Sequence, residues 1–184
     1  MIRTLVVDNH PAVRYGLLAA LRGEPGLVPV AAAAGMREAL TEARRNDLDV
    51  ALVDYHLWDG DGLQLCHRLK ALASAPRVLI YTAFDAPDLE VAAAVAGADG
   101  ILDKGAPLEE LFEAVRSVAR GGSVYSALRP SAIEQVVPRV ETEDLPIFGM
   151  RLDGAPLSEI AEILNVDEAA VSGRLLAMLA RLAR

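Results

Sequence analysis

The chain has 184 residues, of which 53% are hydrophobic and only 4% aromatic, so alanine and aliphatic side chains must fill its core. Eighteen Lys and Arg against 26 Asp and Glu give a net charge of −8, the wrong sign for a generally basic surface that holds nucleic acid or a membrane. No apolar run approaches the roughly 18 residues of a spanning helix, and Asp8 interrupts the first run where a signal peptide would continue. The single cysteine, Cys66, excludes an internal disulfide and a Cys-rich zinc site. We therefore expect a soluble, cytoplasmic protein without membrane contact.

The first 121 residues alternate short apolar runs with longer amphipathic segments. The short runs are partly β-branched and bounded by Asp, Pro or Gly, as in strands with both faces covered. They are Ile2–Val7, Leu27–Ala33, Val50–Asp54, Val78–Thr82 and Gly100–Leu102. Between them, apolar residues recur every three to four positions, which favours helices that pack on the strands. Five such units predict an α/β fold with a doubly wound, five-stranded parallel sheet over residues 1–121.

The rest of the chain is predicted to be helical. Residues 122–143 carry two prolines and scattered charge without a sustained period, which predicts a linker with room for one short helix. In residues 144–184 the apolar pattern of Ser158–Leu164 breaks at Asn165-Val166, and Asp167 then caps a second helix. Two helices joined by about three residues predict a small all-α helix-turn-helix domain.

Reactive polar residues stand at four strand ends: Asp8-Asn9, Asp54, Thr82 and Lys104. In a parallel α/β sheet, the carboxyl ends of the strands form the ligand crevice. Carboxylates there can bind Mg²⁺, and one of them can attack phosphorus while the lysine and the hydroxyl hold the phosphoryl oxygens. Any one of these residues alone is also an ordinary strand-end side chain. Four in register predict phosphoryl-transfer chemistry with Mg²⁺ as the cofactor.

The sequence around these residues contains five short motifs that characterise a known family. These are Leu5-Val6-Val7-Asp8-Asn9-His10-Pro11, Val53-Asp54, Asp61-Gly62, Tyr81-Thr82-Ala83 and Asp103-Lys104-Gly105. On these motifs, residues 1–121 resemble the flavodoxin-like receiver domain of two-component response regulators of the LuxR/NarL type. The resemblance implies a signalling protein that a sensor histidine kinase phosphorylates.

The same resemblance assigns roles to individual residues. Asp54 is the phospho-acceptor, Thr82 the switch hydroxyl and Lys104 the partner of the phosphoryl group. The metal ligands are Asp8, Asn9, Asp54 and the main-chain carbonyl of His56.

Four positions set this chain apart or have no assigned role. Asn9 stands where the family usually has a second Asp, so metal affinity should fall. Trp58 replaces a proline, which would loosen the loop or let the indole cover the site, and Ile101 makes an aromatic-gated switch unexpected. His10 is compatible with packing or capping and with tuning of the site. Both a phosphorylatable and a degenerate receiver therefore remain open.

Residues 144–184 resemble a shortened LuxR-type helix-turn-helix through Gly154, Glu159-Ile160-Ala161 and Val166 to Val171. The second helix would enter the major groove, with Ser172 and Arg174 as its DNA-binding residues. From Leu145 on, four Arg face five acids, a net charge of −1, so few phosphate contacts are expected. Pro146 would delay the start of the first helix of this domain.

The chain stops at Arg184, where the family continues into a fourth helix often used for pairing. We therefore expect homodimerisation through the receiver, particularly through Leu108–Arg120, and promoter DNA as a weakly bound partner. An atypical receiver that binds a protein or ligand without direct DNA contact is the alternative. An enzyme is not expected, because haloacid-type phosphatases need an Asp where His10 stands and no glycine-rich phosphate loop follows the first strand.

Overall fold

A computed structural model describes residues 1–84, 87–125 and 129–183. Five parallel strands form one sheet in the order β2-β1-β3-β6-β7. Their bounds are β1 Ile2–Val7, β2 Leu27–Ala33, β3 Val50–Val53, β6 Arg77–Thr82 and β7 Gly100–Asp103. The chain runs outward from β1 in one direction and from β3 in the other, which opens a crevice at their carboxyl ends. The predicted doubly wound parallel sheet is confirmed.

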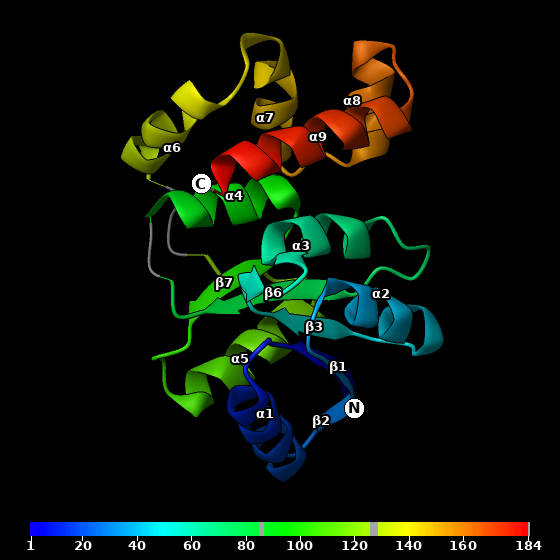
Figure 1. Cartoon of the computed structure of the whole chain (residues 1–184), viewed down its shortest axis with the longest axis vertical. Helices are drawn as coiled ribbons and strands as arrows, with labels where there is room; N and C mark the ends of the chain where they lie inside the picture. Colours follow the sequence, from blue (N-terminus) through cyan, green and yellow to red (C-terminus); the bar gives the residue numbers. More distant parts are fainter. Residues whose placement is uncertain (85–86, 126–128, 184) are drawn as a thin grey trace.

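Helices cover both faces of the sheet (Figure 1). One face carries α1 (Pro11–Gly23) and α5 (Leu108–Ala119), and the other carries α2 (Met36–Arg45), α3 (Gly62–Lys70) and α4 (Pro87–Ala96). A short hairpin, β4 (His56–Leu57) and β5 (Gly60–Asp61), lies between β3 and α3 and was not predicted from the sequence. Asp61 ends this hairpin and caps α3 by accepting a hydrogen bond from Gln64 N at 2.9 Å.

The C-terminal chain is helical, as predicted. It consists of α6 (Pro130–Val136), the 3₁₀ turns η1 (Val137–Arg139) and η2 (Thr142–Asp144), α7 (Leu145–Leu152), α8 (Leu157–Leu164) and α9 (Glu168–Leu182). Pro146 lies in the first turn of α7, where its missing N–H costs nothing. Asn165 ends α8 in the left-handed region with φ 53°, and Asp167 caps α9 by accepting from Ala170 N at 2.6 Å.

Helix α4 is packed from two sides. Its inner side contacts the sheet and α3, and its outer side contacts α6, α7 and α9, which form a third layer above it (Figure 1). Of the residues of α4 whose side chains the structure describes, six are buried: Leu89, Val91, Ala92, Ala93, Val95 and Ala96. A helix that is apolar over most of its circumference is stable only when neighbours cover it all round. The receiver and the C-terminal helices consequently share one apolar core.

Polar contacts join the same two parts of the chain. Arg139 pairs with Asp88 at the start of α4 at 2.7 Å, and Arg151 Nε donates to the carbonyl of Val95 near its end at 3.0 Å. These cations bracket the apolar interface. Across the described ranges, no helix is both long and apolar enough to cross a membrane.

We predict that shortening one buried side chain of α9 destabilises the whole chain. Leu175 is fully buried in the shared core, so Leu175→Ala should lower the free energy of unfolding by about 2–5 kcal/mol in a urea titration followed by circular dichroism. Ile163→Ala on α8 is the matched control, because Ile163 is 61% exposed. A separate early transition in Leu175→Ala, with the main transition unmoved, would contradict the shared core.

Candidate functional site

Two buried carboxylates meet at the carboxyl edge of the sheet. Asp8 follows β1 and Asp54 follows β3, and these strands are neighbours. The side chains of Asp8 and Asp54 are 2% and 5% exposed. The backbone continues the pairing, because Asp54 N donates to the carbonyl of Val7 at 2.8 Å. The strands therefore hold the two carboxylates side by side.

Lys104 is the counter-ion of both carboxylates. Its Nζ lies 2.6 Å from Asp8 Oδ2 and 2.9 Å from Asp54 Oδ2, and its side chain is 15% exposed. Burial by itself lowers the pKa of the Lys104 ammonium, but hydrogen bonds and charge from Asp8 and Asp54 outweigh this, so the pKa lies above the usual 10.5. Lys104 is thus positively charged at neutral pH and is held in place at the carboxyl edge of the sheet.

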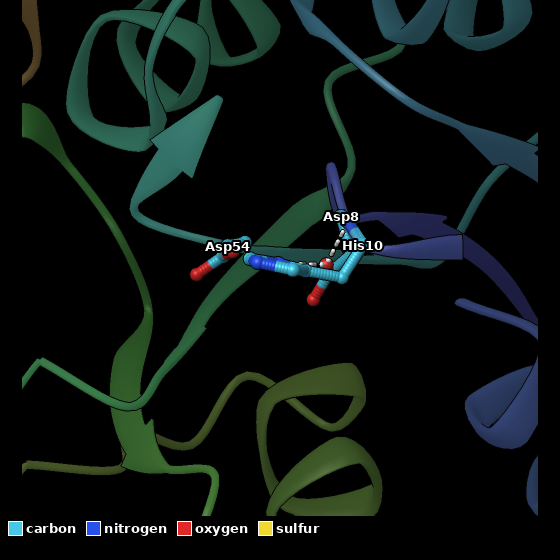
Figure 2. Close-up of side chains that lie close together, drawn as sticks. All are labelled: Asp8, His10 and Asp54. Atoms are coloured by element: carbon cyan, nitrogen blue, oxygen red, sulfur yellow. Dashed lines mark hydrogen bonds and ion pairs between the residues drawn. The ribbon is translucent and has the colours of Figure 1, made fainter. Parts of the chain in front are cut away.

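His10 contributes a nitrogen to the same cluster. Its backbone N–H donates to Asp8 Oδ1 at 2.8 Å, and its ring Nδ1 lies 3.3 Å from the same oxygen. One donor atom each from Asp8, His10 and Asp54 lies within 4.8 Å of the others (Figure 2). The sequence left the role of His10 open, and the structure places it beside both carboxylates.

The residues at this edge have the chemistry of a hard-cation site. Two carboxylates supply charged oxygens, and Asn9 Oδ1 is buried with no hydrogen-bond partner among the described residues. A buried acceptor without a donor is costly unless a ligand completes it. This orphaned oxygen fits a divalent cation, which prefers oxygen ligands. The carbonyl of His56 as a ligand stays a prediction.

Comparison with known proteins agrees with this geometry. The family model of the response regulator receiver domain matches residues 4–116. The chain belongs to the response regulator family. The nitrate/nitrite response regulator NarP of Escherichia coli K12 is 32% identical over 178 residues, covering 92% of this chain and 83% of NarP. The DNA-binding transcriptional activator DevR/DosR of Mycobacterium tuberculosis is 29% identical, covering 99% of this chain and 88% of its own length.

A solved structure extends the likeness to three dimensions. The signal receiver domain of the putative response regulator NarL from Mycobacterium tuberculosis has 32% sequence identity and a TM-score of 0.63. The match covers 65% of this chain and 97% of that domain. The chain is therefore a two-component response regulator of the NarL type with a flavodoxin-like receiver.

The hydroxyl of Thr82 is linked to an aromatic pair through a backbone hydrogen bond. Thr82 is buried at the end of β6, and its Oγ1 accepts a hydrogen bond from Phe84 N at 3.1 Å. The Phe84 ring stacks on Tyr55 with 5.5 Å between the centroids, and the Tyr55 hydroxyl donates to the carbonyl of Ala183 after α9 at 2.9 Å. A continuous set of contacts therefore joins the end of β6, at the carboxyl edge of the sheet, to the end of α9.

Trp58 lies away from the carboxylates. Its side chain is 63% exposed, it packs beside Gly35, and the guanidinium of Arg37 lies 5.6 Å from its ring. The loop is held in place by Asp59, which accepts from Met36 N at 2.6 Å and caps α2 from a distance. The indole therefore does not cover the site, and the hairpin and the Asp59 cap fix the loop by hydrogen bonds.

Both residues that the sequence assigned to DNA are engaged within the chain. Ser172 Oγ and His67 Nε2 on α3 form a 2.8 Å hydrogen bond. Arg174 Nε pairs with Asp144 Oδ1 at 2.7 Å, and its Nη2 donates to the carbonyl of Glu143. Burial and the nearby Arg151 and Arg68 lower the pKa of His67 to about 4, so the imidazole facing Ser172 is neutral at pH 7. In this arrangement the second helix of the helix-turn-helix faces the receiver.

We predict that Lys104→Met leaves Asp8 and Asp54 as uncompensated buried charges. The variant should be about 3 kcal/mol less stable near neutral pH in chemical denaturation. Because the pKa of Lys104 is raised by folding, its stabilisation is complete below about pH 10.5 and is lost as the pH rises through the higher folded value. The difference in the free energy of unfolding between wild type and variant should become smaller above that pH. A difference that does not change with pH would contradict the ion pair.

Proposed function

We propose that Asp54 accepts a phosphoryl group from the phosphohistidine of a sensor histidine kinase and that this controls transcription through the C-terminal helices. The observation that carries the proposal is the ammonium of Lys104 held between Asp8 and Asp54 at the carboxyl edge of the sheet. A carboxylate nucleophile needs cationic neighbours to approach an anionic phosphoryl group. Lys104 supplies such a charge in a site that is largely shielded from water.

The chemistry is a displacement at phosphorus. An Asp54 oxygen forms a bond to the phosphoryl group while the bond from phosphorus to the donor nitrogen breaks, which yields an acyl phosphate. Lys104 Nζ, now 2.9 Å from Asp54, can bind one phosphoryl oxygen, and the Thr82 hydroxyl can donate to another. Asp8, Asn9 and Asp54, with the His56 carbonyl, would hold Mg²⁺, which offsets phosphoryl charge when bound.

The contacts of Thr82 supply a route for the signal. A hydroxyl that turns toward a phosphoryl oxygen gives up its hydrogen bond with Phe84 N. Phe84 stacks on Tyr55, and Tyr55 holds the carbonyl of Ala183 after α9. Moving this pair would weaken the docking of α9, so phosphorylation favours release of the C-terminal helices. The aromatic gate is then built by Phe84 and Tyr55, with the half-buried aliphatic Ile101 outside it.

Release would make Ser172 and Arg174 available to promoter DNA. DevR/DosR, which matches nearly the whole chain, is a DNA-binding transcriptional activator, and this supports the same role here. The net charge of −1 after Leu145 leaves each helix-turn-helix few phosphate contacts. Pairing two copies through the receiver, with α5 as the contact helix, would raise the effective concentration of the second site.

Phosphorylation is tested by intact-mass measurement after incubation with acetyl phosphate. Wild type should gain one phosphate in the presence of Mg²⁺ and none in EDTA, and Asp54→Asn should gain none. Asn9→Asp should lower the Mg²⁺ concentration needed, because a second charge strengthens binding of the divalent ion. Asp153→Asn, an exposed acid on the C-terminal helices, is the control and should react as wild type does. An unmodified wild-type protein at saturating Mg²⁺ would refute the proposal.

Transcriptional control is tested by gel shift with the DNA upstream of the protein's own gene. Acetyl phosphate should increase binding by the wild type. Tyr55→Phe removes the bond to Ala183 and should raise binding about fivefold without phosphodonor, the effect of one neutral hydrogen bond. Tyr15→Phe is the matched control, since Tyr15 is 69% exposed. Equal DNA binding by wild type and Tyr55→Phe would contradict the proposal that the signal passes through Phe84 and Tyr55 to α9.

A further inference from the structure

A cavity lies between the receiver and the C-terminal helices, away from the carboxylate edge. Its volume is about 440 Å³, within the range of small-molecule sites. The receiver lines it with the end of α3, the start of β6 and the end of α4, and the C-terminal part lines it with α7, α8 and the start of α9. Because Arg77 begins β6 and Thr82 ends it, this cavity and Asp54 lie at opposite edges of the sheet.

On the receiver side, two cations share one acid. Lys70 Nζ lies 2.5 Å from Asp99 Oδ2, and Arg77 Nη1 lies 2.9 Å from Asp99 Oδ1. Asp99 also accepts a hydrogen bond from Val78 N at 2.7 Å. The Asp99 carboxylate thus accepts from three donors, and the cluster of Lys70, Arg77 and Asp99 has a net charge of +1.

On the C-terminal side, Arg151 brings a cation without a carboxylate. Its Nε donates to Val95 O, its Nη1 donates to Ala155 O at 2.7 Å, and no acid among the described residues forms an ion pair with it. Its Nη2 lies against Gly97, at a place that the Cβ of any other residue would occupy. Burial lowers the pKa of this guanidinium, which shows the cost of keeping the charge there. A bound anion would repay that cost.

Helix α8 adds a second attraction for an anion. Its first residues, Leu157 and Ser158, line the cavity, and its N-cap is Pro156, which makes no side-chain cap. The free N–H groups of a first helical turn and the helix dipole both favour negative charge. Lys70, Arg77 and Arg151 against Asp99 and Glu168 give the lining a net charge of +1 in a chain that carries −8.

We propose that this cavity binds a small phosphorylated molecule about the size of a mononucleotide. The phosphate group of this molecule lies between the side chains of Arg151 and Arg77 and the first turn of α8. The rest of the ligand packs on three alanines at and just after the end of α4, Ala94, Ala96 and Ala98, and on the imidazole of His67. Such a ligand touches the receiver and the C-terminal helices at once, so its binding stabilises their packed arrangement.

The test uses pyrophosphate and adenosine monophosphate as probes of the full chain. Isothermal titration calorimetry at constant ionic strength should show saturable binding of at least one probe, and that probe should raise Tm. Arg151→Gln and Arg77→Gln should each weaken binding about tenfold, the effect of losing a charged hydrogen bond. Arg22→Gln, an exposed arginine of α1 on the other face of the sheet, removes the same charge and should bind as wild type does.

Variants on the receiver side keep the proposal testable if Arg151→Gln does not fold. Lys70 and Arg77 both pair with Asp99 and are partly exposed, so Lys70→Gln and Arg77→Gln then carry the test. Asp54→Asn should bind the probe as wild type does, which separates this site from phosphotransfer. Absence of binding and of a Tm shift at millimolar probe, or binding that every cavity variant leaves unchanged, would overturn the proposal.

Discussion

The apolar circumference of α4 is the constraint on which the rest of the structure depends. The buried residues Leu89, Val91, Ala92, Ala93, Val95 and Ala96 take up most of the circumference of this helix, so leaving its outer side in water would expose apolar surface at a cost in free energy. The third layer of α6, α7 and α9 removes that side from solvent and joins two predicted domains into one core. The position of α9, and with it the availability of the helix-turn-helix, therefore follows from how the receiver packs.

Buried acids determine where this acidic chain places its cations. Lys104 pairs with two carboxylates at the carboxyl edge of the sheet, and Asp144 pairs with both Arg174 and Arg181 in the third layer. An ionised carboxylate in the interior costs several kcal/mol unless it is paired. Asp144 therefore binds two of the arginines of α9, including Arg174, which the sequence assigned to DNA. Pairing with Asp144 holds Arg174 within the third layer.

The link between the two ends of the molecule is short because Tyr55 directly follows Asp54 along the chain. Its ring stacks on Phe84, whose backbone N–H donates to the Thr82 hydroxyl, and its own hydroxyl donates to the carbonyl of the residue after α9. Few contacts thus separate Asp54 from the docked helix. Each contact is individually weak, so the proposed phosphorylation of Asp54 would need to supply only a small free energy to shift the balance between docked and released helices.

The sequence by itself determined the sheet, the strand-end carboxylates with Lys104, and the start of α7 at its proline, because these depend on local pattern and on the parallel topology. It left His10 without an assigned role and placed Ser172 and Arg174 on a free DNA-binding face. Only the tertiary structure decided that His10 lies beside both carboxylates and that α9 turns toward the receiver. These outcomes depend on contacts between residues far apart in the chain, which no periodicity records.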